Sequence, residues 1–398
     1  MVIPFFDKPC LTRMDEIEVT DKGTIVIVSN THWHFAWQTG NSVAAGFAAR
    51  GYRVLFVEPL PKRWPRLAEL RRVMGRLTGN SRQAGFVSQV VPEGIELVSP
   101  VTLPDVGAFA QTLNQRVFIP RVASKLKQRV ASEGPLILIH GLPIKAAIAL
   151  QNELEPDVAI YRCVYDWSQD PYSGRQLAET DLLQQIDMAW ADCERNLTRV
   201  SKVQKRSVLM PPAVDLSLFA DVSYTRSGQT KPLCVYFGTT GPSIDLELLN
   251  KISHRYTLRL IGPVRTPLEG FAPETELIGP VPHEAIPAMI GDADVLLLPY
   301  NQRPHMQGVI PAKLFECLIT GKPIVATNLT TIDQYQDLVY LCKGHDEVFQ
   351  AIEQAQVEDE TLAARRIRCA HENSWEQRLT QMEAQIEALL ADRPAKGV

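Results

Sequence analysis

Short apolar runs alternate with amphipathic segments along most of the chain. In the first half, runs bounded by polar residues or glycine predict buried strands at 24–29, 53–57, 135–139, 158–161 and 188–193. In the second half, similar runs predict strands at 233–237, 257–261, 276–278, 294–298 and 324–327. Strands that alternate with helices form parallel sheets covered on both faces, with ligands at the carboxyl ends of the strands. The pattern therefore predicts an α/β protein.

The length predicts more than one domain, because 398 residues exceed what a single hydrophobic core usually organises. We predict a first domain over residues 1–205, beginning with an irregular leader at 1–22, and a second domain over 206–373. The tail at 374–398 is predicted to contain one further helix, from 374 to 390.

The segment from Pro311 to Gly321 predicts a helix between two buried strands. Proline suits the first helical turn, and glycine suits the left-handed cap. Lys313 and Glu316 lie three residues apart, so both project from one face of the first turn. A cation and a carboxylate at a helix N-terminus suit a ligand with phosphate and vicinal hydroxyls, such as a nucleotide sugar. The alternative is an exposed helical pair that contributes only tenths of a kcal/mol.

Five short motifs follow one another in the second half, at 209–219, 235–241, 260–263, 278–283 and 311–325. In this order they resemble GT-B glycosyltransferases, in the branch whose donor helix reads Pro-x-Lys-x-x-Glu and ends in Gly-Lys-Pro-Val. The resemblance implies two Rossmann-like domains whose parallel sheets face a cleft. It also implies that the C-terminal helix crosses back to the first domain.

For the donor, the resemblance implies that Lys313 binds the diphosphate, Glu316 binds the ribose, and the 238–241 backbone approaches phosphate. Residues 279–283 would surround the base, and 300–310 would border the sugar. The predicted donor-binding residues are Gly238, Thr239, Gly241, Pro282, Tyr300, Arg303, His305, Lys313 and Glu316. Uridine is the predicted base by resemblance alone.

Two departures from the pattern weaken assignment to the common retaining branch. Gly308 stands where many retaining members carry the first of two glutamates. The arginine and lysine often found after the first strand of the second domain have no clear counterparts at 238–248. Lys313 and Arg303 are left to counter the charge of the departing diphosphate.

Two residues are predicted for the reaction itself. Asp166 resembles the acidic residue of inverting polysaccharide transferases such as the xanthan-type glucuronosyltransferases, and a carboxylate can act as the base. Its alternative role is a helix cap. His140 ends a predicted strand where retaining relatives keep a histidine near the sugar, although such a histidine can simply be a hydrogen-bonded loop residue. We rank Asp166 first, as base, and His140 second, as a sugar contact.

The loop at 31–38 follows the first strand, where a ligand-facing loop is expected. A His-x-His pair suggests metal binding, but no carboxylate or third histidine lies nearby. We predict an acceptor platform made of His34, Trp33 and Trp37.

Asp292 and Asp294 resemble a metal-binding pair, but they run into a buried strand and are predicted to serve its entry. The sequence thus predicts no metal and no cofactor.

Basic residues dominate 61–82, where Glu69 is the lone acid and apolar residues recur at helical spacing. This predicts a helix on an anionic membrane surface, flanked by a basic run at 116–129; the alternative is a core-facing helix with a solvated basic side. No nucleic-acid motif accompanies it.

Seven scattered cysteines, no signal peptide and no run of membrane-spanning length predict a cytoplasmic protein on the inner face of the membrane.

The predicted function is transfer of a sugar from a UDP-linked donor to a lipid-linked saccharide or other glycan, in cell-surface polysaccharide synthesis. Two alternatives stay open. A nucleotide-sugar epimerase of the same fold would need acid and base groups around the sugar but no acceptor. An inactive sugar-binding scaffold would agree with Gly308 in place of a carboxylate.

Overall fold

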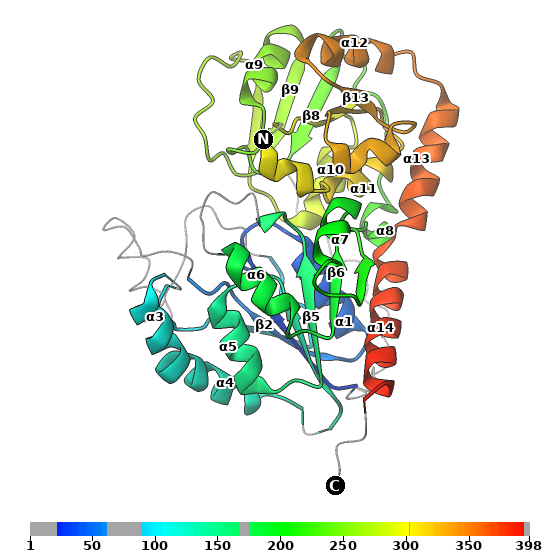
Figure 1. Ribbon diagram of the computed structural model, residues 1–398. Coiled ribbons are helices and arrows are strands. Elements are labelled where there is room, and N and C mark those ends of the chain that lie inside the picture. Colours follow the sequence, from blue (N-terminus) through cyan, green and yellow to red (C-terminus); the bar gives the residue numbers. More distant parts are fainter. Residues whose placement is uncertain are drawn as a thin grey trace, which may run out of the picture.

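The structure is a computed structural model, which describes residues 22–61, 89–104, 106–131, 133–167, 175–301 and 303–393. Nearly all of the predicted leader at 1–22 and of the predicted basic helix at 61–82 lies outside these residues. The described chain forms two parallel sheets with helices packed around them (Figure 1).

The first sheet has seven strands in the order β3-β2-β1-β4-β5-β6-β7. They are β1 (Thr24–Val28), β2 (Arg53–Val57), β3 (Ile95–Val98), β4 (Leu136–His140), β5 (Val158–Cys163), β6 (Met188–Ala191) and β7 (Ser207–Leu209). Around them lie α1 (Thr39–Ala49), α3 (Ala108–Leu113), the π-helix η2 (Asn114–Phe118), α4 (Ile119–Lys127), α5 (Lys145–Leu154), α6 (Arg175–Leu183) and α7 (Glu194–Val200). β1 lies inside the sheet, paired in parallel with both β2 and β4, and all five of its residues are buried.

The second sheet has six strands in the order β10-β9-β8-β11-β12-β13. They are β8 (Leu233–Phe237), β9 (Thr257–Ile261), β10 (Glu276–Gly279), β11 (Val295–Leu298), β12 (Ile324–Thr327) and β13 (Tyr340–Cys342). The accompanying helices are α8 (Leu216–Phe219), α9 (Leu246–Arg255), η4 (His283–Ala285), α10 (Ile286–Met289), η5 (Pro304–Gly308), α11 (Lys313–Leu318), η6 (Thr330–Tyr335), α12 (His345–Ala355) and α13 (Glu360–Glu372).

All ten predicted strands are present, within one or two residues of the predicted ends. β3, β7 and β13 were not predicted, because each is only three or four residues long and only partly buried. β7 pairs with β6, so the first sheet continues to Leu209. The first sheet thus includes residues 207–209, which follow the predicted boundary after residue 205.

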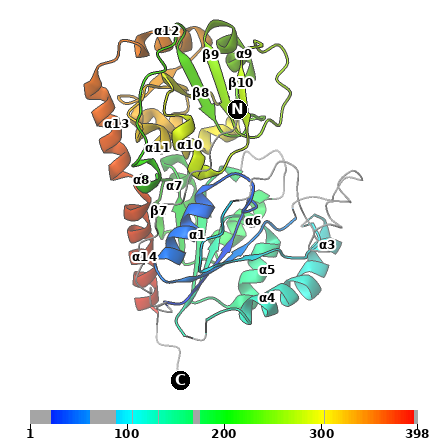
Figure 2. The ribbon, with the colours of Figure 1, turned by 180° about the vertical axis from the view of Figure 1, so that it is seen from behind.

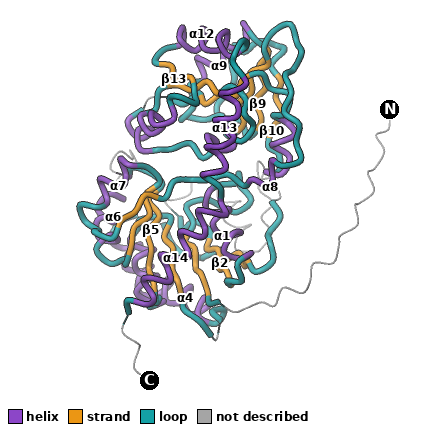
Figure 3. The backbone as a smooth tube through the Cα atoms, turned by 90° about the vertical axis from the view of Figure 1, so that its right-hand side faces the viewer, coloured by secondary structure: helices purple, strands orange, loops and turns teal. Residues whose placement is uncertain are grey.

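The last helix, α14 (Trp375–Ala391), returns to the first domain as predicted and lies beside α1 (Figures 1 and 2). Leu379, Met382 and Ile386 are buried in the same apolar cluster as β1 and β2. The approach to α1 is so close that a Cβ on Gly46 would lie 2.0 Å from Leu379 Cδ1. Seen from the side, α13 and α14 run in succession along both domains (Figure 3). None of the described helices is both long and apolar enough to span a bilayer.

Candidate active site

Three strand ends of the second sheet meet at backbone positions that carry no side chain. Gly238 follows β8 and Gly262 follows β9, with φ angles of 137° and 130° that favour glycine. The Gly238 N–H donates to the carbonyl of Ile261, and the Gly262 N–H donates to the carbonyl of Gly279. A Cβ on Gly262 would lie 2.5 Å from the Gly238 carbonyl oxygen. Only bare backbone fits at this edge, which leaves room for a ligand to approach closely.

Lys313 from α11 reaches this glycine-lined edge. A Cβ on Gly238 would lie 2.4 Å from Lys313 Cε and 2.9 Å from Nζ. Gly321, with φ of 70°, follows α11 and takes the left-handed conformation that the sequence predicted there. The structure therefore brings the predicted phosphate-binding lysine and the predicted phosphate-binding loop together.

Glu316, one turn further along α11, has a partner that the sequence did not indicate. His283, at the start of η4, holds its Nε2 atom 2.9 Å from Glu316 Oε1. Trp37, in the loop between β1 and α1, stacks on His283 with ring centroids 5.4 Å apart and planes 7° apart. The only signal in the sequence was the position of His283 after β10, which pointed to the base rather than to a carboxylate.

The other predicted donor residues have different surroundings. Tyr300 is buried, and burial raises the pKa of its phenol. The carbonyl of Thr239 accepts a hydrogen bond from the Tyr236 hydroxyl. Gly241 is buried, Pro282 caps η4 from an exposed position and Arg303 is exposed; the His305 side chain lies outside what the structure describes.

Asp166 lies where residues of the two domains meet. Its carboxylate is 3.5 Å from the guanidinium groups of both Arg195 and Arg199, and only 2% of the residue is exposed. A Cβ on Gly308 would lie 2.7 Å from Asp166 Cβ. Asn196 in α7 donates to the Gly308 carbonyl at 2.9 Å. A glutamate therefore has no room at position 308 in this arrangement, because Asp166 packs against it.

His140, which was predicted to contact the sugar, has buried surroundings in the structure. The residue ends β4 in the middle of the first sheet and is fully buried. Its Nε2 atom is 2.7 Å from the Gln151 side-chain oxygen on α5. Burial lowers the pKa of His140 to about 4, so the imidazole is neutral near pH 7. The strand end was predicted correctly, but the side chain points into the helix layer.

The three residues of the predicted platform, His34, Trp33 and Trp37, differ in their exposure. Trp33 is fully buried, donates its indole N–H to the Val90 carbonyl and therefore offers no face to a sugar. Trp37 is half-buried, and its stacking partner is His283. His34 is half-buried, and its buried Nδ1 atom has no hydrogen-bond partner among the described residues.

The aspartates near β11 have the structural roles that were predicted. Asp294 accepts hydrogen bonds from the backbone N–H groups of Ser227 and Leu233, and Asp292 pairs with Arg259 at 2.6 Å. Within the described part of the chain, no three His, Cys, Asp or Glu side chains gather as metal ligands would.

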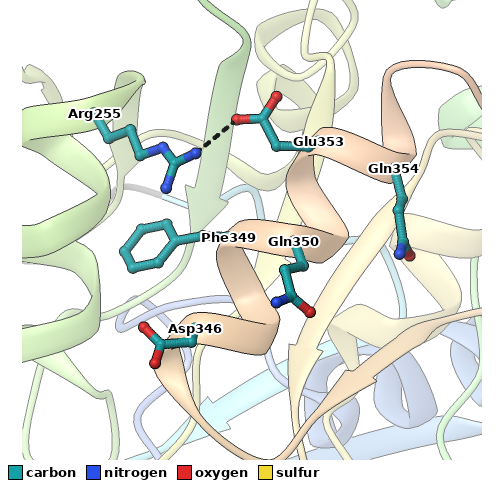
Figure 4. Close-up of a pocket in the computed structure, with 6 residues that line it drawn as sticks. All are labelled: Arg255, Asp346, Phe349, Gln350, Glu353 and Gln354. Carbon is teal, nitrogen blue, oxygen red and sulfur yellow. Dashed lines mark hydrogen bonds and ion pairs between the residues drawn. The ribbon is translucent and has the colours of Figure 1, made fainter.

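A hollow of about 580 Å³ lies between α9 and α12, on the outer side of the second domain (Figure 4). Arg255 pairs with Glu353 at 3.2 Å and lies 5.2 Å from the Phe349 ring centroid. These residues are engaged with one another and lie away from the strand ends that carry the candidate site (Figure 1).

Comparison with known proteins gives one partial sequence match, and no protein-family model matches the chain. TuaH of Bacillus subtilis (strain 168) is provisionally named as a teichuronic acid biosynthesis glycosyltransferase. It is 30% identical over 112 residues, which cover 25% of this chain and 28% of TuaH. The match thus spans little more than a quarter of that relative.

The similar solved structures cover nearly the whole chain. Sucrose-phosphate synthase from Thermosynechococcus elongatus has a TM-score of 0.65 at 13% identity, over 93% of this chain and 100% of its own. HepE of Anabaena, in complex with UDP and glucose, has a TM-score of 0.60 at 13% identity, over 92% of this chain and 99% of its own. The lipopolysaccharide outer core galactosyltransferase WaaB has a TM-score of 0.57 at 10% identity, over 92% of this chain and 99% of its own. The chain has the GT-B fold.

The fold predicted from five short motifs is thereby confirmed. A GT-B protein has two parallel-sheet domains; here α11 reaches the 238–241 loop within the second domain, and η4 of that domain meets the β1–α1 loop of the first. At 10–13% identity these structures show the fold alone.

Proposed function

We propose that this GT-B protein transfers a sugar from a nucleotide sugar to a saccharide acceptor. The observation that carries the proposal is the position of Lys313, whose ammonium group lies against the bare backbone of Gly238, with Glu316 one turn further along α11. A cation beside exposed backbone suits a diphosphate, and a carboxylate accepts hydrogen bonds from ribose hydroxyls. One helix, α11, thus carries a group suited to the diphosphate and a group suited to the ribose, the two parts that nucleotide sugars share.

Two comparisons support this activity and the choice of UDP. HepE, a solved neighbour, binds UDP and glucose. TuaH, the partial relative, is named as a glycosyltransferase. The proposed acceptor is a lipid-linked saccharide or another glycan of the cell surface.

Asp166 is the proposed base for the acceptor hydroxyl. It is contributed by the first domain and packs against Gly308 of the second, close to the segment that leads into α11. Because Asp166 is nearly buried in this arrangement, an acceptor hydroxyl can reach it only if residues around 308 move. No metal is assigned to the proposed reaction, in which Lys313 would counter the diphosphate charge.

The proposed function is tested with the full chain, a panel of radiolabelled nucleotide sugars and a bacterial lipid extract. We expect one label to move into the organic phase or onto an added glycan, and UDP to be released. Conversion of the sugar without an acceptor would identify an epimerase. Binding without turnover would identify a scaffold, and no binding of any nucleotide sugar would reject the proposal.

A membrane partner is proposed from α3, η2 and α4. Arg116, Arg121, Lys125 and Lys127 are exposed along this stretch, and Phe109 is 79% exposed at its start. An exposed apolar side chain on a stretch that also exposes basic groups suits an anionic lipid surface. Figure 1 shows α3 and α4 on the flank of the first domain opposite α14.

Flotation with liposomes tests this partner. We expect the chain to float with vesicles containing phosphatidylglycerol at low salt, and Arg121→Glu/Lys125→Glu/Lys127→Glu to lose most of that binding. The matched control is Lys202→Glu/Lys205→Glu/Arg206→Glu, which makes an equal charge change elsewhere on the first domain and should still float. No flotation of the unmodified chain, or equal loss in both variants, would contradict the membrane proposal.

A further inference from the structure

One loop of the first domain, residues 29–38 between β1 and α1, reaches two loops that border the donor site. The Arg265 guanidinium lies 4.5 Å from the Phe35 ring centroid. The backbone of Arg265 is tied to the 238–241 loop, because its N–H donates to the Thr240 carbonyl at 2.9 Å. The second contact is the stack of Trp37 on His283. The 29–38 loop therefore contacts Arg265, which is tied to the 238–241 loop beside Lys313, and His283, which pairs with Glu316.

Trp37 is held by an aromatic column that begins in the first-domain core. Phe56 on β2 meets Trp33 edge to face, with centroids 5.1 Å apart. Trp33 meets Trp37 at 5.6 Å and 73°. The Trp37 indole N–H donates to Ser42 Oγ at 2.8 Å, which fixes the ring about its own axis. The ring that faces His283 is thus set by buried packing rather than by solvent.

His283 in turn restrains the side chain of Glu316, because the two are hydrogen-bonded. An ionised carboxylate can only accept hydrogen bonds, so the His283 Nε2–H donates to Glu316 Oε1 at 2.9 Å. Among the described residues, no other hydrogen bond to the Glu316 carboxylate is formed, so its Oε2 and the remaining lone pair of Oε1 can accept from a ligand. Both side chains are largely buried, at 15% and 18% exposed, so neither swings freely.

We propose that His283 and Trp37 are positioning residues that hold Glu316 in the orientation that accepts the donor's ribose hydroxyls. The first domain then completes the donor site through the column Phe56–Trp33–Trp37–His283 without touching the nucleotide. The inference rests on the proposed function, in which Glu316 binds ribose. A carboxylate fixed in advance binds with a smaller loss of side-chain freedom, which raises affinity.

Calorimetry with UDP, GDP, ADP and CDP tests the inference on the full-length chain. For whichever nucleotide binds, we expect His283→Ala to weaken binding about tenfold and Trp37→Ala about threefold, as one lost restraint implies. His283→Gln keeps an N–H donor and should recover part of the loss. Trp37→Phe keeps a stacking ring and should bind nearly as the unmodified chain does. If either alanine variant fails to fold, the nucleotide affinities of these two milder variants still test the inference.

The decisive measurement is a double-mutant cycle. Because His283 acts through Glu316, Glu316→Ala/His283→Ala should bind no more weakly than Glu316→Ala alone. In transfer assays, His283→Ala should raise the donor KM while kcat and the acceptor KM stay unchanged, a split that general destabilisation would not produce. Arg255→Ala, in the outer hollow, is the control and should change neither constant.

Three outcomes would overturn the inference. Losses that add in the double variant would mean that His283 contacts the nucleotide directly. Unchanged affinity in all the His283 and Trp37 variants, with Glu316→Ala still weakened, would remove the positioning role and leave the proposed function standing. If no nucleoside diphosphate binds the unmodified chain, both fail together.

Discussion

Replacing Asp166 with asparagine should abolish sugar transfer, by about a hundredfold to ten-thousandfold, while nucleotide binding is preserved. The carboxylate is the proposed acceptor of the hydroxyl proton, and an amide of the same shape cannot take that proton at neutral pH. It belongs to the first domain, whereas the Gly238–Lys313 edge that is proposed to hold the diphosphate belongs to the second. Initial rates of transfer and UDP calorimetry on the same preparation measure the two effects separately.

The position of Asp166 also supplies the competing explanation. Its contacts with Arg195 and Arg199 could make it an ion-pair partner that holds the first domain together. In that case the asparagine variant would lose thermal stability, donor affinity and activity in parallel. Normal transfer, or such a parallel loss, would reject the base assignment.

Replacing Glu316 with alanine should weaken binding of UDP and of the nucleotide sugar by roughly ten- to a hundredfold. A hydrogen bond to a charged group contributes about 1.5–3 kcal/mol, and each 1.4 kcal/mol is a factor of ten in affinity. At saturating donor, kcat should change little, because the ribose contact is made before and during transfer alike.

Two variants make this prediction specific. Glu316→Gln keeps one oxygen acceptor and should lose less affinity than alanine. Glu284→Ala removes an exposed carboxylate beside His283 and should leave donor binding unchanged. If calorimetry gave the same affinity for Glu316→Ala and the unmodified chain, the donor would have to bind elsewhere.

Much of the fold could be predicted from the sequence because its signals are local. Runs such as Thr24–Val28 are buried strands wherever they occur in an alternating pattern, since every residue in them is apolar or β-branched. The glycine after α11 takes the left-handed conformation for a reason that involves only its own backbone. For the same reason, Lys313 and Glu316 could be placed on one helical turn, and Asp294 at a strand entry.

The side chains whose surroundings the sequence did not indicate depend on contacts between distant segments. His140 stands at a strand end like a site residue, but Gln151 and the surrounding core enclose it. The pattern around Trp33 is equally compatible with an exposed loop, until Phe56 and the Val90 carbonyl cover it. No local signal distinguishes the two outcomes, because burial is decided by the packing of separate elements.

The sequence by itself determined the two parallel sheets, the returning C-terminal helix, and the lysine and glutamate of α11. Hydrophobic periodicity and backbone conformation act over a few residues, so they can be seen in the chain. Only the tertiary structure decided that Lys313 lies over Gly238, that Asp166 fills the space beside Gly308, and that Trp37 and His283 join the first domain to Glu316. Each of these depends on where two segments far apart in sequence come to rest, which the docking of the two domains sets.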